Sequence, residues 1–155
     1  MSTERFDALA RRAAPLFDRG ESSGLSSLTG PERVLFSVWG AAGQIENGGF
    51  DQFFYNSSGD YAAEAVEAFR AVGAVAKAAV IARALALFPN AAPPRVRDER
   101  IGALDALTAR AGEDVFESLD EAFYASPEDV DAMLAVYVQA HDDEIAPAPG
   151  PAADV

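Results

Sequence analysis

Residues 29–49 read TGPERVLFSVWGAAGQIENGG, and they predict a helix with a marked beginning and a marked end. Thr29 and Glu32 have the spacing of a capping box, in which each residue satisfies a backbone N–H of the other. The apolar positions that follow fall within one arc of about 120° at 100° per residue. They are Val34, Leu35, Val38, Ala41, Ala42 and Ile45. Gly48 and Gly49 end the helix, because glycine accepts the left-handed backbone that a helix C-terminus often needs.

Apolar residues recur at spacings of three and four along the remaining chain, and the alternating β-branched runs of strands are missing. The further helices that this pattern predicts are 3–18, 60–72, 74–88, 98–111, 113–124 and 127–142. The residues that the first of them is expected to bury are Phe6, Leu9, Ala13 and Leu16. The sequence therefore predicts an all-α fold, a single compact domain of about seven helices over residues 1–145. Residues 146–155 are rich in proline and alanine and predict a disordered tail.

Capping residues and turn residues set the expected boundaries of these helices. Asp60 and Ser126 are each expected to cap the N-terminus of the helix that follows them. Residues 19–28 are rich in glycine and serine and predict a loop, and residues 50–55 form a short aromatic segment before the next turn.

Composition excludes several classes of function. The chain of 155 residues has no cysteine and one histidine, which excludes disulfides, thiolate zinc sites, a cysteine nucleophile and multi-histidine metal sites. Its 25 acidic and 12 basic residues give a net charge of −13, which argues against direct binding to nucleic acid or to an anionic membrane. The charged N-terminus has no signal-peptide core, so we expect a cytoplasmic protein.

The negative charge is concentrated in the last third of the chain. Residues 1–100 hold 12 acidic and 11 basic residues, whereas residues 101–155 hold 13 acidic residues and one arginine. On a helix over 113–124, four carboxylates three or four residues apart would share one face and form a rigid negative ridge. The predicted partner-binding acidic face consists of Glu113, Asp114, Glu117, Asp120, Glu121, Glu128, Asp129 and Asp131. The alternative interpretation is a solvated face that only keeps the protein soluble.

No motif in the sequence matches a catalytic or metal-binding site in full. Gly48 and Gly49 are not followed by the Lys-Ser/Thr pair of a phosphate-binding loop. Residues 56–60 begin like a calcium loop, but Tyr61 stands where the sixth-position glycine belongs. His141 is expected to be a packed or capping histidine. We therefore expect no catalytic residue, no metal and no cofactor, with a small hydrolase that uses paired carboxylates as a remote alternative.

Residues 44–60, QIENGGFDQFFYNSSGD, form the most unusual stretch of the chain. It resembles the hallmark of a small bacterial family of acidic, all-helical proteins with a domain of unknown function, whose best-known member is a double-stranded DNA mimic. The matching residues are Glu46, Asn47, Gly48, Gly49, Phe50, Gln52, Phe53, Phe54, Asn56 and Gly59. Residues 119–124, LDEAFY, and the pair Tyr137–Val138 are also similar to the family. The resemblance covers residues 31–141.

From the residues themselves, this motif is mainly structural. The two glycines permit a tight reversal of the chain, the phenylalanines supply core anchors, and the amides Asn47, Gln52 and Asn56 can satisfy backbone groups at helix ends. The alternative is a pocket or partner surface, and its lining residues would be Glu46, Asn47, Gln52 and Tyr55.

The resemblance implies a dimer whose acidic surface occupies the DNA site of a transcription factor, and it is also shared by domains found beside toxin–antitoxin and immunity systems. The expected function is therefore a non-enzymatic acidic protein–protein interaction module, a DNA mimic that binds a basic partner. The alternative is an immunity or antitoxin-like protein that caps a toxin. Both interpretations expect a homodimer that does not bind duplex DNA directly.

Overall fold

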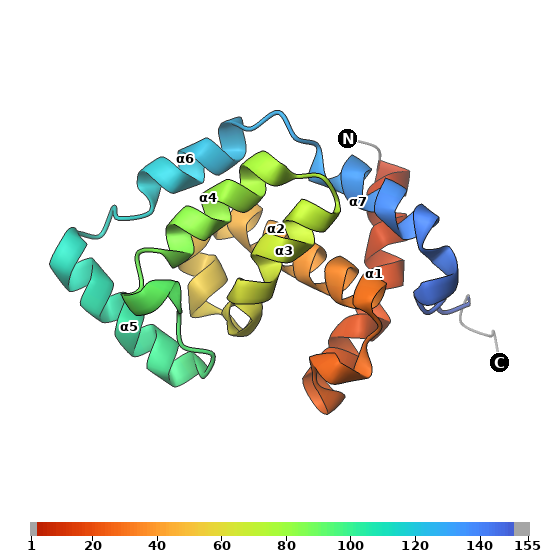
Figure 1. Ribbon diagram of the computed structural model, residues 1–155, viewed down its shortest axis with the longest axis horizontal. Coiled ribbons are helices and arrows are strands. Elements are labelled where there is room, and N and C mark those ends of the chain that lie inside the picture. The colour runs from red at the N-terminus through yellow and green to blue at the C-terminus, as the bar shows by residue number, and fades with distance from the viewer. Residues whose placement is uncertain (1–2, 151–155) are drawn as a thin grey trace.

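The computed structural model describes residues 3–150, and this part of the chain contains seven α-helices, four short 3-10 helices and no strand (Figure 1). The elements are α1 (Thr3–Ser23), η1 (Leu25–Ser27), α2 (Gly30–Tyr55), η2 (Ser57–Tyr61), α3 (Ala62–Ala71), α4 (Val75–Leu85), η3 (Pro89–Ala91), α5 (Arg97–Ala111), α6 (Glu117–Ala125), α7 (Val130–Ala140) and η4 (Asp142–Glu144). The prediction of a single compact all-α domain is confirmed.

Helix α2 is the central element of the fold and contacts α1, α3, α5, α6 and α7 (Figure 1). Its predicted capping box is present. The Thr29 hydroxyl accepts from the backbone N–H of Glu32 at 3.2 Å, and the backbone N–H of Thr29 donates to the Glu32 carboxylate at 3.0 Å. Leu35, Val38 and Ile45 on the predicted stripe are fully buried, so this face forms the middle of the hydrophobic core.

The two glycines interrupt α2 as the sequence predicts. Gly48 has φ −151° and ψ 20°, and Gly49 has φ 73° and ψ −172°. Helical geometry resumes immediately, so the aromatic residues 50–55 form a second, short segment of α2 that leaves the first at an angle. A side chain at Gly49 would be strained, because its positive φ lies in the region that favours glycine.

Helix α1 differs from the expectation of a helix that ends at residue 18. It continues through Gly20 to Ser23, because Gly20 is buried against the ring of Phe36. A Cβ at Gly20 would lie 3.0 Å from that ring. Phe6, which was expected in the core, is 45% exposed and packs on Trp39, with the two ring centres 5.0 Å apart.

Three other predicted helix starts are wrong. Asp60 lies within η2 and does not cap α3. Ser126 does not cap α7, which begins at Val130, and the Asp129 carboxylate accepts from the third residue of that helix instead. Residues 113–116 form a turn, so α6 begins at Glu117.

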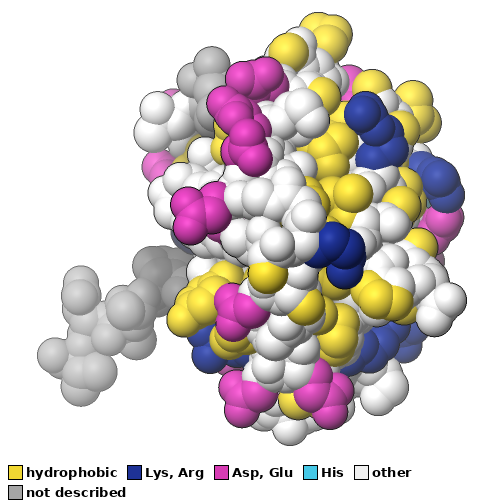
Figure 2. All heavy atoms as spheres, turned by 90° about the vertical axis from the view of Figure 1, so that its left-hand side faces the viewer, with side chains coloured by type: hydrophobic (Ala, Val, Ile, Leu, Met, Phe, Trp, Pro, Cys, Tyr) yellow, Lys and Arg dark blue, Asp and Glu magenta, His cyan; other side chains and the backbone are white. Residues whose placement is uncertain are grey.

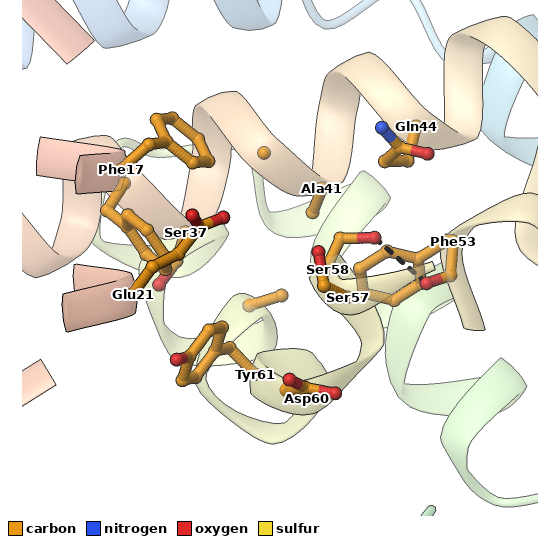
Figure 3. A pocket seen from close by; sticks show the side chains of 13 residues that line it. Phe17, Glu21, Ser37, Ala41, Gln44, Phe53, Ser57, Ser58, Asp60 and Tyr61 are labelled. Atoms are coloured by element: carbon orange, nitrogen blue, oxygen red, sulfur yellow. Dashed lines mark hydrogen bonds between the residues drawn. The ribbon is translucent and has the colours of Figure 1, made fainter. Parts of the chain in front are cut away.

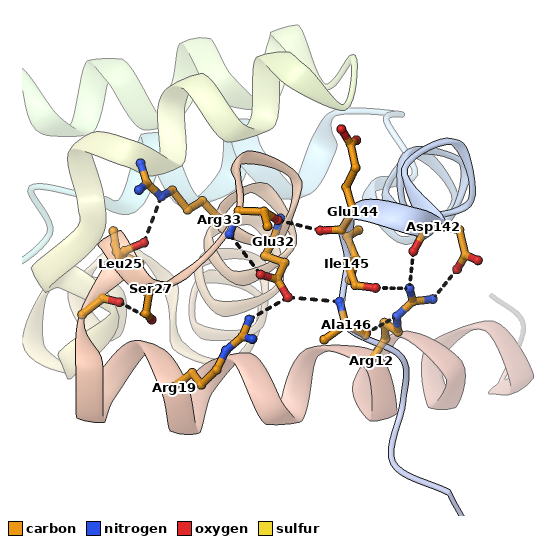
Figure 4. A network of polar contacts seen from close by, with 12 residues as sticks. Arg12, Arg19, Leu25, Ser27, Glu32, Arg33, Asp142, Glu144, Ile145 and Ala146 are labelled. Atoms are coloured by element: carbon orange, nitrogen blue, oxygen red, sulfur yellow. Dashed lines mark hydrogen bonds and ion pairs between the residues drawn. The ribbon is translucent and has the colours of Figure 1, made fainter.

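Residues 142–146, which we call the strap, cross α1 and are held by Arg12 (Figure 4). The Arg12 guanidinium donates to the backbone oxygens of Ala146 at 2.6 Å and Ile145 at 2.7 Å, and to the Asp142 carboxylate at 2.7 Å. Ile145 is buried. The chain thus remains attached to the helical body through Ala146, the first residue of the expected tail. Residues 151–155 of that expected tail lie outside the described residues.

Glu32 connects the strap to the beginning of α2. Its buried carboxylate accepts from the backbone N–H of Ala146 at 3.0 Å and lies 2.6 Å from the Arg19 guanidinium (Figure 4). Burial opposes ionisation of Glu32, but the backbone hydrogen bonds from Thr29 and Ala146 and the nearby Arg19 outweigh it and lower the pKa. One carboxylate therefore satisfies groups from α1, α2 and the strap.

Candidate functional site

The aromatic residues of the motif form the centre of the core beside the break in α2. Phe50, Phe53 and Phe54 are each at most 1% exposed. The ring of Phe54 lies 4.8 Å from that of Phe88 and 5.5 Å from that of Phe116. The expectation that these three phenylalanines anchor the core is confirmed.

Helix α6 holds the break in α2 from both sides. The Asp120 carboxylate accepts from the backbone N–H of Phe50 at 2.8 Å, and the Tyr124 hydroxyl donates to the backbone oxygen of Ile45 at 2.7 Å. A Cβ at Gly49 would lie 2.6 Å from the Asp120 carboxylate, so only glycine fits there. Residues 119–124 and the glycine pair are therefore two parts of one structural unit.

The side-chain amides of the motif bind one another. The Gln44 side-chain oxygen accepts from Gln52 and from Asn56, each at 2.8 Å, and the Gln52 oxygen accepts from Asn47 at 3.0 Å. A Cβ at Gly48 would collide with the Gln52 amide. The expectation that these amides satisfy backbone groups is wrong, because they form a network that spans the break in α2.

Arg100 is the most deeply embedded polar residue, and no sequence pattern pointed to it. Its side chain is 0% exposed and lies beside Gly59, where a Cβ would collide with the guanidinium. The guanidinium lies 2.8 Å from the Asp60 carboxylate. Its backbone acceptors, at 2.6–3.0 Å, are the carbonyl oxygens of Phe54, Asn56, Pro94 and Arg95. Arg100 thus fixes the end of the motif to the segment before α5.

Asp120 provides a test of how the break in α2 is stabilised. Burial, together with the nearby charges of Asp51 and Glu117, raises the pKa of Asp120, and the hydrogen bond from Phe50 only partly opposes this. The stability that protonated Asp120 contributes is therefore fully present below pH ~3.9, its ordinary pKa, and is lost as the pH rises through the higher folded-state pKa.

We expect D120N to be about as stable as the wild type at pH 7, since an amide oxygen can still accept from Phe50. D120A should be less stable by about 1–2 kcal/mol, because the Phe50 N–H loses its partner. Between pH 7 and pH 4, urea denaturation should show the wild type gaining stability relative to D120N. Glu121→Gln, on the exposed side of α6, is the matched control. A difference that is independent of pH would contradict this account.

Beside the break lies a shallow hollow of about 260 Å³, which we call the acidic groove. Its carboxylates are Asp51, Glu113, Asp114, Glu117 and Asp120. A second hollow shares Asp51 and extends along α5 past Asp105. No Lys or Arg side chain lines either of them. No group of acidic or histidine side chains within residues 3–150 is arranged to hold a metal ion.

The predicted acidic face is not continuous. Glu113, Asp114, Glu117 and Glu121 are exposed, but Asp120 faces the break in α2. The view of the α5 end in Figure 2 shows acidic side chains mainly at its upper left and along its lower edge, with hydrophobic side chains between them and most of the basic ones toward the right. The groove therefore gathers only part of the exposed negative charge, since Glu121 is exposed outside it.

The other members of the predicted face have structural contacts. The Glu128 carboxylate accepts from the backbone N–H groups of Ala76 at 3.0 Å and Lys77 at 2.8 Å, and so caps α4. Asp129 caps α7 and lies 3.9 Å from Arg5. These two acidic residues stabilise helix ends, a role that the sequence did not reveal.

Glu46 and Asp131 lie close enough for their charges to interact, and neither of them lines the groove. Burial and their neighbouring carboxylates raise the pKa of both, and the nearby Lys77 partly opposes this. Lys77 itself is buried, with its ammonium 4.7 Å from the centre of the Phe123 ring. Glu46 thus interacts with Asp131 and Lys77 and does not line the pocket in which the sequence placed it.

The predicted motif pocket is present only in part. Gln52 and Tyr55 line the second hollow, but Glu46 and Asn47 do not. Tyr55 is 51% exposed, and the guanidinium of Arg97 lies 4.8 Å from the centre of its ring. The ring of His141 packs against that of Tyr137, with the ring centres 4.3 Å apart, as expected of a packed histidine.

These features define a small all-helical protein in which a groove lined by carboxylates lies beside a broken central helix. The model of the DMP19-like protein family matches residues 26–141, which include the motif, the break and α6. The chain therefore belongs to the DMP19-like protein family. No curated protein and no solved structure matches it. Within residues 3–150, none of the helices combines the length and the apolar character needed to cross a membrane.

Proposed function

We propose that the protein is a non-enzymatic interaction module that presents the acidic groove to a basic protein, in the manner of a DNA mimic. The observation that carries the proposal is the groove itself, in which five carboxylates surround one hollow without a lining base. Lys and Arg side chains on a DNA-binding surface are the natural complement of such a site.

The rigidity of the groove supports this proposal. Asp51 lies on the second segment of α2, and Glu117 lies on α6, and Asp120 ties these two elements together through Phe50. Carboxylates on fixed elements hold their positions before a partner arrives, so less conformational entropy is lost on binding. A DNA mimic requires such an arrangement, because phosphates on B-DNA are themselves spaced regularly, about 3.4 Å of helix axis apart per strand.

Charge reversal in the groove is the direct test. The double variant E113K/E117K should bind the partner at least about tenfold more weakly than the wild type, with most of the change in the association rate. The partner is first isolated by affinity pull-down and identified by mass. Binding kinetics are then measured across a salt series, because exposed charge pairs are screened within about 8–10 Å at 0.10–0.15 M salt.

The matched control is E67K/E99K, which changes the net charge equally on exposed positions of α3 and α5 outside the groove. Asp120 is unsuitable for this test, since its replacement by lysine would also remove the contact with Phe50. Equal weakening by both double variants would contradict a specific role of the groove. A mobility shift of duplex DNA by the purified protein would contradict mimicry, and a toxin among the captured partners would favour an immunity function.

A further inference from the structure

A cavity of about 220 Å³ lies between α1, α2 and η2, separate from the acidic groove (Figure 3). Phe17 and Glu21 of α1 lie on one side of it, and Phe53 and Ser58 lie on the other. Its volume suits a single side-chain-sized group, because pockets for drug-sized ligands begin at roughly 300 Å³. The motif of residues 44–60 contributes a large part of its lining.

Aromatic rings form one wall of this cavity. The ring of Phe36 lies 4.7 Å from that of Phe17 and 5.2 Å, edge to face, from that of Tyr61. Ring faces carry partial negative charge and attract organic cations within about 6 Å. The wall is therefore suited to an aliphatic stem that ends in a positive charge.

One hydroxyl that lines the cavity has no partner inside the described part of the protein. Ser37 is 5% exposed, and its hydroxyl has no hydrogen-bond partner among residues 3–150. Its oxygen can accept a hydrogen bond, which a bound cation would donate. The hydroxyl borders the cavity, so a group that enters the cavity can reach it.

The charge of the cavity is negative. Its lining includes Glu21 and Asp60 but no lysine, arginine or histidine. Within residues 3–150, Glu21 has no ion-pair partner, whereas Asp60 is already paired with Arg100. Burial raises the pKa of Tyr61, and Asp60, Glu21 and Glu64 add to the effect, as expected where the potential is negative.

We propose that this cavity takes a single arginine side chain of the basic partner. The stem would lie against Phe17, Phe36 and Tyr61, and the guanidinium would face Glu21 and the Ser37 hydroxyl. Arginine suits the site better than lysine, because its planar head stacks on rings and donates several hydrogen bonds at once. The source of the arginine rests on the proposed function, but the preference of the cavity for a cation does not.

The test uses two probes of nearly equal shape, N-acetyl-arginine amide and its uncharged analogue N-acetyl-citrulline amide. In an NMR titration with labelled protein, the arginine probe should shift the backbone signals of Ser37, Gly40 and Tyr61, with a Kd in the millimolar range typical of a fragment. The citrulline probe should bind at least about tenfold more weakly, since it lacks the charge.

Two variants report on the cavity itself. A41L fills it and should abolish the shifts, while E21Q, at an exposed position that the fold tolerates, should weaken binding of the arginine probe several-fold. E99Q, an exposed glutamate on α5, is the matched control and should have no effect. Absence of shifts at tens of millimolar arginine probe, or equal binding of the citrulline probe, would overturn the proposal.

Binding measurements with the partner and with E113K/E117K distinguish the proposal for the cavity from the proposal for the groove. E113K/E117K should bind the arginine probe as the wild type does, since the groove and the cavity share no lining residue. If E21Q loses the probe but binds the partner normally, the cation is a free small molecule, and the assignment to a partner side chain is overturned. If E21Q weakens binding of both the probe and the partner while E113K/E117K weakens neither, the proposal for the cavity is supported and the proposal for the groove is contradicted.

Discussion

Replacing Arg100 with methionine is expected to lower the free energy of unfolding by about 3–5 kcal/mol, the range typical of breaking a buried ion pair. Methionine fills much of the same space but donates no hydrogen bond. The carbonyl oxygens of Phe54 and Asn56, the Asp60 carboxylate and the two carbonyls before α5 would lose their shared partner. Each buried acceptor without a partner adds to the cost.

The measurement is the midpoint of urea denaturation with its slope. R110M is the control, because Arg110 lies on the exposed face of the same helix, and it should change stability by no more than about 0.5 kcal/mol. A wild-type midpoint for R100M would mean that the contacts of Arg100 at the end of the motif contribute nothing to the stability of the fold.

Replacing Phe54 with alanine should also cost about 3–5 kcal/mol, as large-to-small substitutions of buried aromatic residues do. Phe54 is 0% exposed and its ring packs against four other phenylalanine rings, so the cavity left behind could not close without moving several helices. F53A should behave similarly, since Phe53 is 1% exposed.

Tyr55 offers an internal control for these substitutions. It is the next residue in the chain but is half exposed, and its main contact is with the Arg97 guanidinium. We expect Y55A to cost at most about 1 kcal/mol. If thermal melts show that F54A destabilises the protein no more than Y55A does, Phe54 does not act through burial, and a partner surface at this site is favoured.

The central helix was predictable because its signals are local. The capping box at Thr29 and Glu32, the buried stripe and the glycine pair all act within a few residues, so the sequence places them correctly. The extent of α1 was not predictable in the same way. Gly20 usually indicates a helix end, but here a tertiary contact with Phe36 favours a helical glycine.

The candidate site was predictable only where side chains contact residues that are near them in the sequence. Asp120 and Glu128 look like members of a solvated acidic face, yet each accepts from the backbone of a helix far away in the chain. Arg100 left no signal, because its partners are mostly carbonyl groups, which every residue carries. Composition located the negative charge in the last third, but only the fold reveals which carboxylates face outward.

The strap also has a consequence for the order in which the fold is completed. Arg12 is hydrogen-bonded to a residue 134 positions later, and Glu32 to one 114 positions later. Contacts so distant in sequence require a large loop to close and form slowly. During synthesis from the N-terminus, Arg12 meets its strap partners only once residues 142–146 have emerged, whereas Glu32 has Thr29 and Arg19 early and lacks only its bond from Ala146. The beginning of the central helix, although it is made early, therefore completes its native contacts only after residue 146 is available.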